Sequence, residues 1–180
     1  MKLELYNEVV EKTKTLFSKA HIVLNEKEKN EIEVADFGLN DVYITGLELV
    51  TYMNTDRCCA KELVLLPLQT CPEHYHPPFN GHDGKEETFR CRYGVVYLYV
   101  EGKPSTNPYA KPPVETKEFY TVWHEIVLHA GDQYTIFPNT KHWFQGGADG
   151  AVVSEFSTKS FDEEDIFTNP NIIREALLEE

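Results

Sequence analysis

The sequence has little positive charge, few cysteines and no long hydrophobic run. Its 180 residues include 17 lysines and arginines against 30 aspartates and glutamates, which gives a net charge of −13 at pH 7. A chain of this charge repels phosphate groups, so we expect it to bind neither nucleic acid nor an anionic membrane surface. The first eight residues, MKLELYNE, mix charged and apolar side chains, unlike a signal peptide. We therefore expect a cytoplasmic protein.

The cysteine pattern supports neither a zinc knuckle nor a disulfide framework. Cys58 and Cys59 are adjacent, Cys71 and Cys91 stand apart, and no CxxC pair occurs. Free thiols in a reducing compartment are the simplest interpretation of the four cysteines.

The hydrophobic pattern predicts one helix followed by many short strands. Tyr6, Val9, Val10, Thr13 and Phe17 repeat at helical spacing. From about residue 32, runs of β-branched and aromatic residues alternate with turn residues, which indicates an antiparallel sandwich or barrel. The expected strands are 42–45, 47–51, 63–66, 87–93, 95–100, 119–128, 133–137 and 151–156.

Two later segments differ from this strand pattern. Residues 103–116 contain four prolines and are expected to form a long surface loop. Near the C-terminus, Asn169 is a candidate helix cap and Pro170 a candidate first helical residue, so a short helix is predicted there.

Histidines and one glutamate form a candidate metal site. His74 and His76 are two residues apart, and prolines on both sides exclude a helix, so on a strand both imidazoles point to one face. The pair alone is weak evidence for a metal. Glu87 begins an alternating strand and His142 follows a later turn, and three nitrogens with one oxygen suit Mn²⁺, Fe²⁺, Zn²⁺, Co²⁺ or Ni²⁺. Glu86 competes with Glu87, but strand alternation places Glu87 on the face that carries the apolar residues.

These residues resemble the two motifs of the cupin superfamily. His74-x-His76, Glu87 after ten more residues and a glycine after six more are similar to the first motif, whose histidine-to-glutamate gap is usually shorter. Residues 131–142 are similar to the second motif, with Asn139 where glycine is usual. The resemblance implies an all-β fold, the cupin double-stranded β-helix (jelly-roll barrel), to which the helical patterns above add an N-terminal helix and a short C-terminal helix. The expected parts of a single domain, 1–180, are a helical segment at 1–31, the barrel at 32–161 and a solvated acidic tail at 162–180.

A closer resemblance is to the cupin-type D-lyxose isomerases, through residues 65–76, 85–94 and 153–157. It implies a Mn²⁺-dependent aldose–ketose isomerase, commonly a homodimer, which interconverts D-lyxose with D-xylulose and often D-mannose with D-fructose. The ligands of the metal ion that it implies are His74, His76, Glu87 and His142.

Glu155 and Lys61 are the candidate catalytic residues. Glu155 interrupts an apolar run, and if alternation points it inward its carboxylate is a candidate proton carrier between C1 and C2 of the sugar. Lys61 resembles a lysine that the isomerase family uses near its substrate, although a solvated edge-strand lysine is an equal alternative. A metal-assisted hydride shift stays open as the mechanism.

Other interpretations of the site remain open at this stage. They are a cupin phosphoglucose isomerase, an Fe²⁺-dependent dioxygenase and a non-catalytic sugar-binding cupin. A zinc-protease motif is excluded, because His124 and His129 are five residues apart on a predicted strand, whereas that motif needs a spacing of four on a helix. His82, in a glycine-flanked turn, is expected to be solvated.

Overall fold

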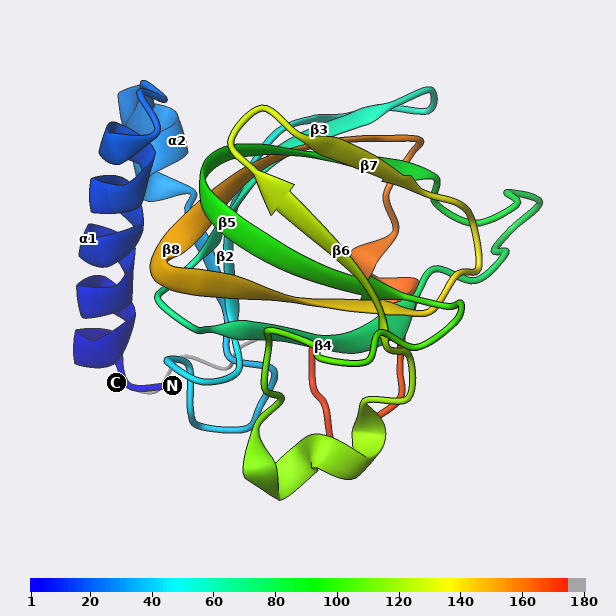
Figure 1. The fold of residues 1–180 in the computed structure, drawn as a ribbon. Helices are drawn as coiled ribbons and strands as arrows, with labels where there is room; N and C mark the ends of the chain where they lie inside the picture. Colours follow the sequence, from blue (N-terminus) through cyan, green and yellow to red (C-terminus); the bar gives the residue numbers. More distant parts are fainter. Residues whose placement is uncertain (175–180) are drawn as a thin grey trace.

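The N-terminal helix α1 spans Leu3–Lys19 in the computed structural model, which describes residues 1–174. The stripe predicted from the sequence is the buried one, since Val9, Thr13 and Phe17 lie against the outer face of the sheet (Figure 1). A second helix, α2 (Glu26–Asn30), begins in a capping box in which the Asn25 side chain accepts a bond from the Glu28 amide.

The rest of the described chain is mostly strand. The strands are β1 (Glu33–Ala35), β2 (Leu47–Asn54), β3 (Cys59–Leu65), β4 (Thr70–Tyr75), β5 (Glu87–Val100), β6 (His124–His129), β7 (Gln133–Ile136), β8 (His142–Ser157) and β9 (Ile166–Phe167). Two 3₁₀ turns, η1 (Val114–Phe119) and η2 (Asp162–Glu164), lie between them. The predicted strand at 42–45 is wrong, because these residues mostly form a turn, and residues 120–123 precede β6 without strand structure.

Two long strands, β5 and β8, build the barrel. They pair antiparallel from Glu87 opposite Ser157 to Val100 opposite His142. One half of this ladder continues through β3, β2 and β1 on one side and β7 on the other. The other half continues through β4 and β9 on one side and β6 on the other. The strands thus form one continuous sheet whose two halves curl around one interior, the cupin arrangement that the resemblance implied (Figure 1).

The ladder bends where two glycine backbones touch. Gly94 on β5 and Gly150 on β8 both have positive φ, +71° and +77°, and the pairing register shifts beside Gly94. A Cβ atom on Gly94 would lie 2.0 Å from the carbonyl oxygen of Gly150. This close approach, together with the positive φ, requires glycine.

We expect Gly94→Ala to destabilise the protein by about 3 kcal/mol or more, because the clash is with backbone and the φ is unfavourable. Chemical denaturation measures the free energy of unfolding. Gly147→Ala is the control, since its Cβ meets nothing closer than 3.4 Å, and it should cost about 1 kcal/mol or less. Equal losses in the two variants would contradict the role given to the bend.

Three apolar clusters stabilise the fold. The first fills the barrel between the two halves of the sheet, and the second lies between α1 and the outer face of β2, β3 and β8. The third is an aromatic cluster beneath residues 101–123. In the third, Tyr99 stacks on Trp143 with ring centroids 4.0 Å apart. The predicted loop at 103–116 thus covers part of the core.

A buried carboxyl, Glu48, lies in the second cluster, away from the candidate metal site. It is fully buried on β2, and its Oε1 accepts a bond from Gln69 while its Oε2 has no partner. Burial raises the pKa of Glu48 to about 8. In the unfolded chain this group ionises near pH 4.5, so between about pH 4.5 and 8 only the folded state keeps the proton.

This proton makes stability fall as pH rises through that interval, by up to about 1.4 kcal/mol per pH unit. Glu48→Gln removes the proton linkage and keeps an oxygen acceptor for Gln69. The variant should lose less stability than the native protein between pH 5 and 8, as measured by denaturant unfolding at each pH. Identical slopes for both proteins would show that Glu48 is ionised in the folded state.

The C-terminal helix predicted from Asn169 does not form within the described residues. The Asn169 side chain accepts a bond from the Asn171 amide and so stabilises a turn. Residues 158–174, which we call the C-terminal strap, cross one end of the barrel and pair with β4 through β9 (Figure 1). Leu177 and Leu178, part of the predicted helix, lie outside the described residues.

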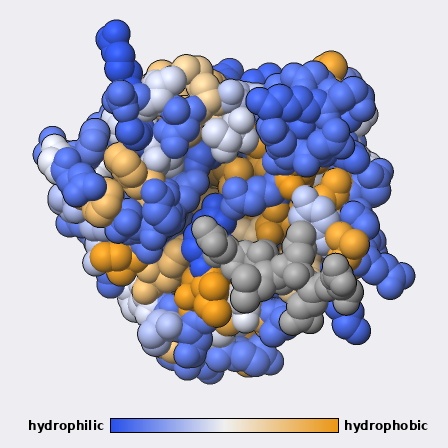
Figure 2. Space-filling view, turned by 180° about the vertical axis from the view of Figure 1, so that it is seen from behind, coloured by the Kyte–Doolittle hydropathy of each residue, from blue (hydrophilic) through white to orange (hydrophobic). Residues whose placement is uncertain are grey.

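The face of the molecule seen from behind is largely polar. Figure 2 shows mainly hydrophilic residues on the far face, with hydrophobic ones in separate patches. None of the described helices is both long and apolar enough to span a membrane.

Candidate metal centre

Three buried histidines converge inside the barrel. His74 lies in β4, His76 directly follows it, and His142 begins β8, which pairs with β4 opposite His74. Their ring centroids are 4.3 to 5.2 Å apart, and one nitrogen from each lies within 4.8 Å of the others. This group can hold one metal ion.

Hydrogen bonds orient each of the three rings. The Nδ1 atoms of His74 and His142 lie 2.8 and 2.9 Å from the carbonyl oxygen of the residue two positions earlier. The Nδ1 of His76 lies 2.5 Å from Oδ1 of Asp165, in the C-terminal strap. Donation from Nδ1 leaves Nε2 as the free ligand atom of each ring, which is the usual support for a metal-binding histidine.

Glu87, the first residue of β5, completes the cluster. Its Oε1 lies 3.0 Å from Nε2 of His142 and 3.3 Å from Nε2 of His76. The Nε2 of His142 is buried and has no hydrogen bond of acceptable geometry. A buried nitrogen without a partner, beside a carboxylate and two further imidazoles, fits a divalent cation at this point. Glu86 is exposed, as the strand alternation predicts.

The local charges keep His74 neutral and Glu87 ionised, the forms in which these two side chains bind metals. Burial, and then the neighbouring histidines, hold the pKa of His74 well below its ordinary value, so this ring is neutral. Burial acts to raise the pKa of Glu87, but Lys85 and His76 outweigh it and hold this pKa well below 4.5. For His76, burial and Lys85 lower the pKa, yet the carboxylates of Glu87 and Asp165 bring it to about 9.

Lys85, which no sequence pattern singled out, connects the histidine–glutamate cluster to Glu155. Its buried ammonium group lies 2.8 Å from Oε2 of Glu87 and 3.1 Å from Oε1 of Glu155. Although burial acts to lower the pKa of Lys85, Glu155 and Glu87 raise it well above its ordinary value. Lys85 precedes Glu87 by two residues, so the same alternation that selected Glu87 could have placed it inside.

Both candidate catalytic residues point into the barrel. Glu155 on β8 is buried and lies on the inward face, the orientation that its candidate role requires. Lys61 on β3, opposite Glu155, is only 3% exposed, so it is not a solvated edge lysine. Its ammonium group binds Asp162 at 2.5 Å and Ser160 at 3.1 Å, both in the C-terminal strap.

The expectation of a solvated acidic tail is therefore wrong for two of its carboxylates, Asp162 and Asp165. Asp162 lies against Lys61, and although burial acts to raise the pKa of Asp162, Lys61 and Lys85 hold it below its ordinary value. Asp165 is bound to His76. These carboxylates meet charged partners about 90 to 100 positions earlier in the chain, which sequence spacing does not reveal.

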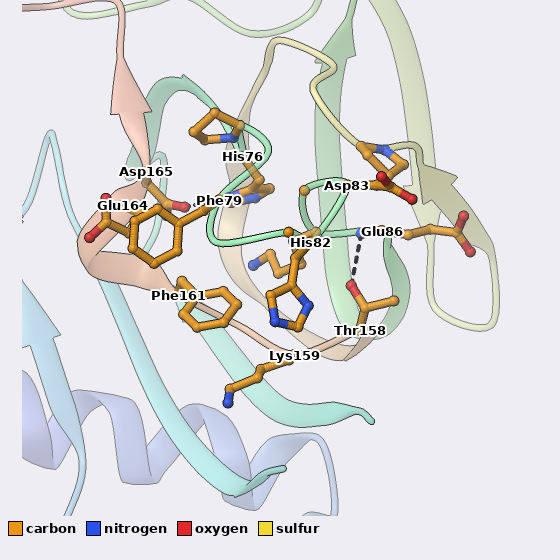
Figure 3. A pocket seen from close by; sticks show the side chains of 15 residues that line it. His76, Phe79, His82, Asp83, Glu86, Thr158, Lys159, Phe161, Glu164 and Asp165 are labelled. Atoms are coloured by element: carbon orange, nitrogen blue, oxygen red, sulfur yellow. Dashed lines mark hydrogen bonds and ion pairs between the residues drawn. The ribbon is translucent and has the colours of Figure 1, made fainter. Parts of the chain in front are cut away.

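Two cavities adjoin the cluster formed by the three histidines and Glu87. The inner cavity, about 30 Å³, is lined by the cluster together with Lys61, Lys85 and Glu155. The outer pocket, about 370 Å³, opens at the end of the barrel between residues 76–86 and the C-terminal strap (Figure 3). His82, exposed as predicted, lies on its wall.

Several proteins of known name are similar in sequence to nearly the whole chain. A D-lyxose/D-mannose isomerase of Thermosediminibacter oceani is 60% identical over 174 residues, 97% of this chain and 96% of the relative. D-lyxose ketol-isomerases of Thermofilum sp. and Cohnella laeviribosi are 58% and 56% identical, over 95% and 97% of this chain and 95% and 96% of their own lengths. No family model matches the chain.

Solved structures confirm the fold. L-ribose isomerase of Acinetobacter sp. DL28, in complex with L-ribose, superposes with a TM-score of 0.81 at 16% identity, over 99% of this chain and 98% of that one. The ligand-free L-ribose isomerase of Cellulomonas parahominis gives 0.79 at 16% identity over the same shares. With a cupin-type barrel and relatives at up to 60% identity over nearly its whole length, the chain belongs to the family of cupin-type D-lyxose ketol-isomerases.

Proposed function

We propose that this protein is a metal-dependent isomerase of neutral free sugars, with D-lyxose to D-xylulose and D-mannose to D-fructose as its reactions. One observation carries the proposal: the buried histidine–glutamate cluster lies next to an inward-facing carboxylate, Glu155, inside a closed barrel. The names of the relatives, D-lyxose and D-mannose isomerases, supply the substrate class.

The ligands of the ion are His74, His76, Glu87 and His142, and Mn²⁺ is the proposed metal, with Zn²⁺, Fe²⁺, Co²⁺ and Ni²⁺ as alternatives. Three imidazoles and one carboxylate suit all of these borderline cations. When bound, the ion supplies a Lewis acid that polarises the sugar oxygens at C1 and C2.

Glu155 is the proposed base. An aldose becomes a ketose when one proton leaves C2 and one is delivered to C1, while a hydroxyl proton passes from O2 to O1. The ammonium group of Lys85, 3.1 Å from Oε1 of Glu155, holds this carboxylate inside the barrel, where it can accept the C2 proton. The same ammonium group, with Lys61 beside the strap, is positioned to donate hydrogen bonds to sugar oxygens.

The charges inside the barrel favour a neutral sugar over a sugar phosphate. Within the part of the chain that the structure describes, each cationic side chain lining the two cavities has a carboxylate partner: Lys61 with Asp162, Lys85 with Glu87 and Glu155, Arg174 with Glu33, and Lys159 with Asp56. A phosphate dianion would need unpaired cations or amide donors. A cupin phosphoglucose isomerase is therefore the weaker interpretation.

We further propose a cytoplasmic homodimer. The outer face of β2 and β8 exposes Tyr52, Met53 and Phe156, and Met53 and Phe156 both pair with Ala60 of β3 between them. A second copy of the chain is a suitable cover for this apolar row. The mass of the purified protein in solution tests this assignment.

Removal of the metal should abolish the isomerase activity. We expect the purified protein to bind about one divalent ion per chain, and dialysis against a chelator to eliminate ketose formation from D-lyxose and D-mannose until Mn²⁺ is restored. His142→Ala should lose both the metal and the activity, as measured by elemental analysis and a ketose assay, whereas His124→Ala on β6 should keep both. Stoichiometric metal without isomerisation of D-lyxose, D-mannose, ribose or glucose would refute the proposed function.

Glu155→Gln should separate catalysis from metal binding. The amide cannot accept the C2 proton, so we expect kcat to fall by about 10² to 10⁴ while the metal content stays at the native level. Glu62→Gln is the matched control, because Glu62 is also buried but faces the outside of the barrel next to Ser154. Full activity of Glu155→Gln would exclude Glu155 as the base.

A further inference from the structure

Next to the candidate metal centre lie an inner cavity and an outer pocket, which have three lining residues in common. His76, Lys85 and Asp165 line both spaces. The inner cavity is about 30 Å³ and the outer pocket about 370 Å³. The two spaces are thus adjacent parts of one site, and the catalytic candidates lie in the smaller part.

The inner cavity is too small for a whole sugar. A volume of about 30 Å³ corresponds to one water molecule, whereas a cavity that binds benzene has about 150 Å³. A pentose or hexose has five or six carbons and at least as many oxygens, so only its reacting end fits beside Glu87 and Glu155. The remaining carbons must occupy other space, and the outer pocket is the adjoining space that is large enough.

The lining of the outer pocket suits the far end of a sugar chain. Figure 3 shows Phe79, His82 and Phe161 gathered on one side, with ring centroids 5.4 Å apart for Phe79 and Phe161 and 5.1 Å for His82 and Phe161. Glu86, Thr158 and Glu164 add polar groups around this aromatic wall. Flat apolar rings next to hydrogen-bonding groups match the C–H faces and hydroxyls of a carbohydrate.

A charged ligand fits this pocket poorly. The half-buried Lys159 in its lining is bound to Asp56 at 2.7 Å and lies over the Phe161 ring. Asp83, Glu86 and Glu164 contribute carboxylates to the same lining. The local charge therefore favours an uncharged polyhydroxylated chain over a phosphate or carboxylate.

We propose that the outer pocket is the distal subsite of the sugar site: it holds the carbons from C4 onward while C1 and C2 react in the inner cavity, and Phe79 determines how well longer aldoses are used. This inference rests on the proposed function. D-mannose repeats the configuration of D-lyxose and adds one carbon at the far end, so the extra hydroxymethyl group would lie against this aromatic wall. Binding energy from such a remote part of the substrate contributes to the rate of the reacting end.

The test compares aldoses of increasing length that share the configuration at C2 and C3: L-erythrose, D-lyxose and D-mannose. For Phe79→Ala, we expect kcat/KM for D-mannose to fall about tenfold more than kcat/KM for L-erythrose, with D-lyxose between them. Phe79→Trp, which narrows the pocket, should lower kcat/KM for D-mannose more than kcat/KM for D-lyxose. Tyr109→Ala is the control, because Tyr109 is an exposed aromatic residue outside both cavities.

Calorimetric binding of the three corresponding alditols, which cannot isomerise, separates this proposal from the proposed function. Binding that tightens with chain length in the native protein and loses this dependence in Phe79→Ala supports the distal subsite, even in a protein that isomerises nothing. Equal fold-changes for all three chain lengths in Phe79→Ala, in catalysis and in alditol binding, would overturn it. Loss of folding is recognised from metal content, which both Phe79 variants should retain.

Discussion

The site depends on the pairing of β5 with β8 and on the bend in that pairing. By register, Glu87 and His142 lie at opposite ends of the ladder, since Glu87 pairs with Ser157 and His142 with Val100. They nevertheless approach to 3.0 Å, because the ladder bends at Gly94 and Gly150 and its two halves face each other as the walls of the barrel. The backbone contact that only glycine permits therefore brings the two metal motifs together.

The second constraint is the balance of buried charge. Removing lysines and carboxylates from water is costly unless each meets a partner. Here Lys85 bridges two glutamates and Lys61 meets Asp162, so the interior holds many charges that largely offset one another. The same pairing leaves hydrogen-bonding groups in place for a neutral substrate while it leaves no surplus positive charge for an anionic one.

Much of this arrangement could be predicted from local patterns, and the remainder required contacts between distant residues. Alternation along a strand is a local property, and it placed Glu87 inward and Glu86 outward; applied two residues earlier, it would also have found Lys85. For Glu155 it left the orientation conditional, and the structure places this carboxylate inward. In the sequence, Asp162 and Asp165 look like part of a solvated acidic run, because no neighbouring residue indicates that they contact Lys61 and His76 in the fold. Within residues 169–174 the predicted helix does not form for a similar reason, since pairing of β9 with β4 and an Asn169-stabilised turn replaced a weak local preference.

The C-terminal strap is fastened at several points, and this bears on how a sugar reaches the metal. Asp162 is bound to Lys61, Asp165 to His76, and Thr168 to the buried carboxylate of Glu73 on β4. Lifting the strap would separate these pairs together and remove from Lys61 and His76 the strap carboxylates that they contact, at a high cost. The outer pocket already opens beside the strap and reaches His76 and Lys85. Entry through this pocket leaves the anchored strap in place, with Asp165 continuing to orient the His76 ring.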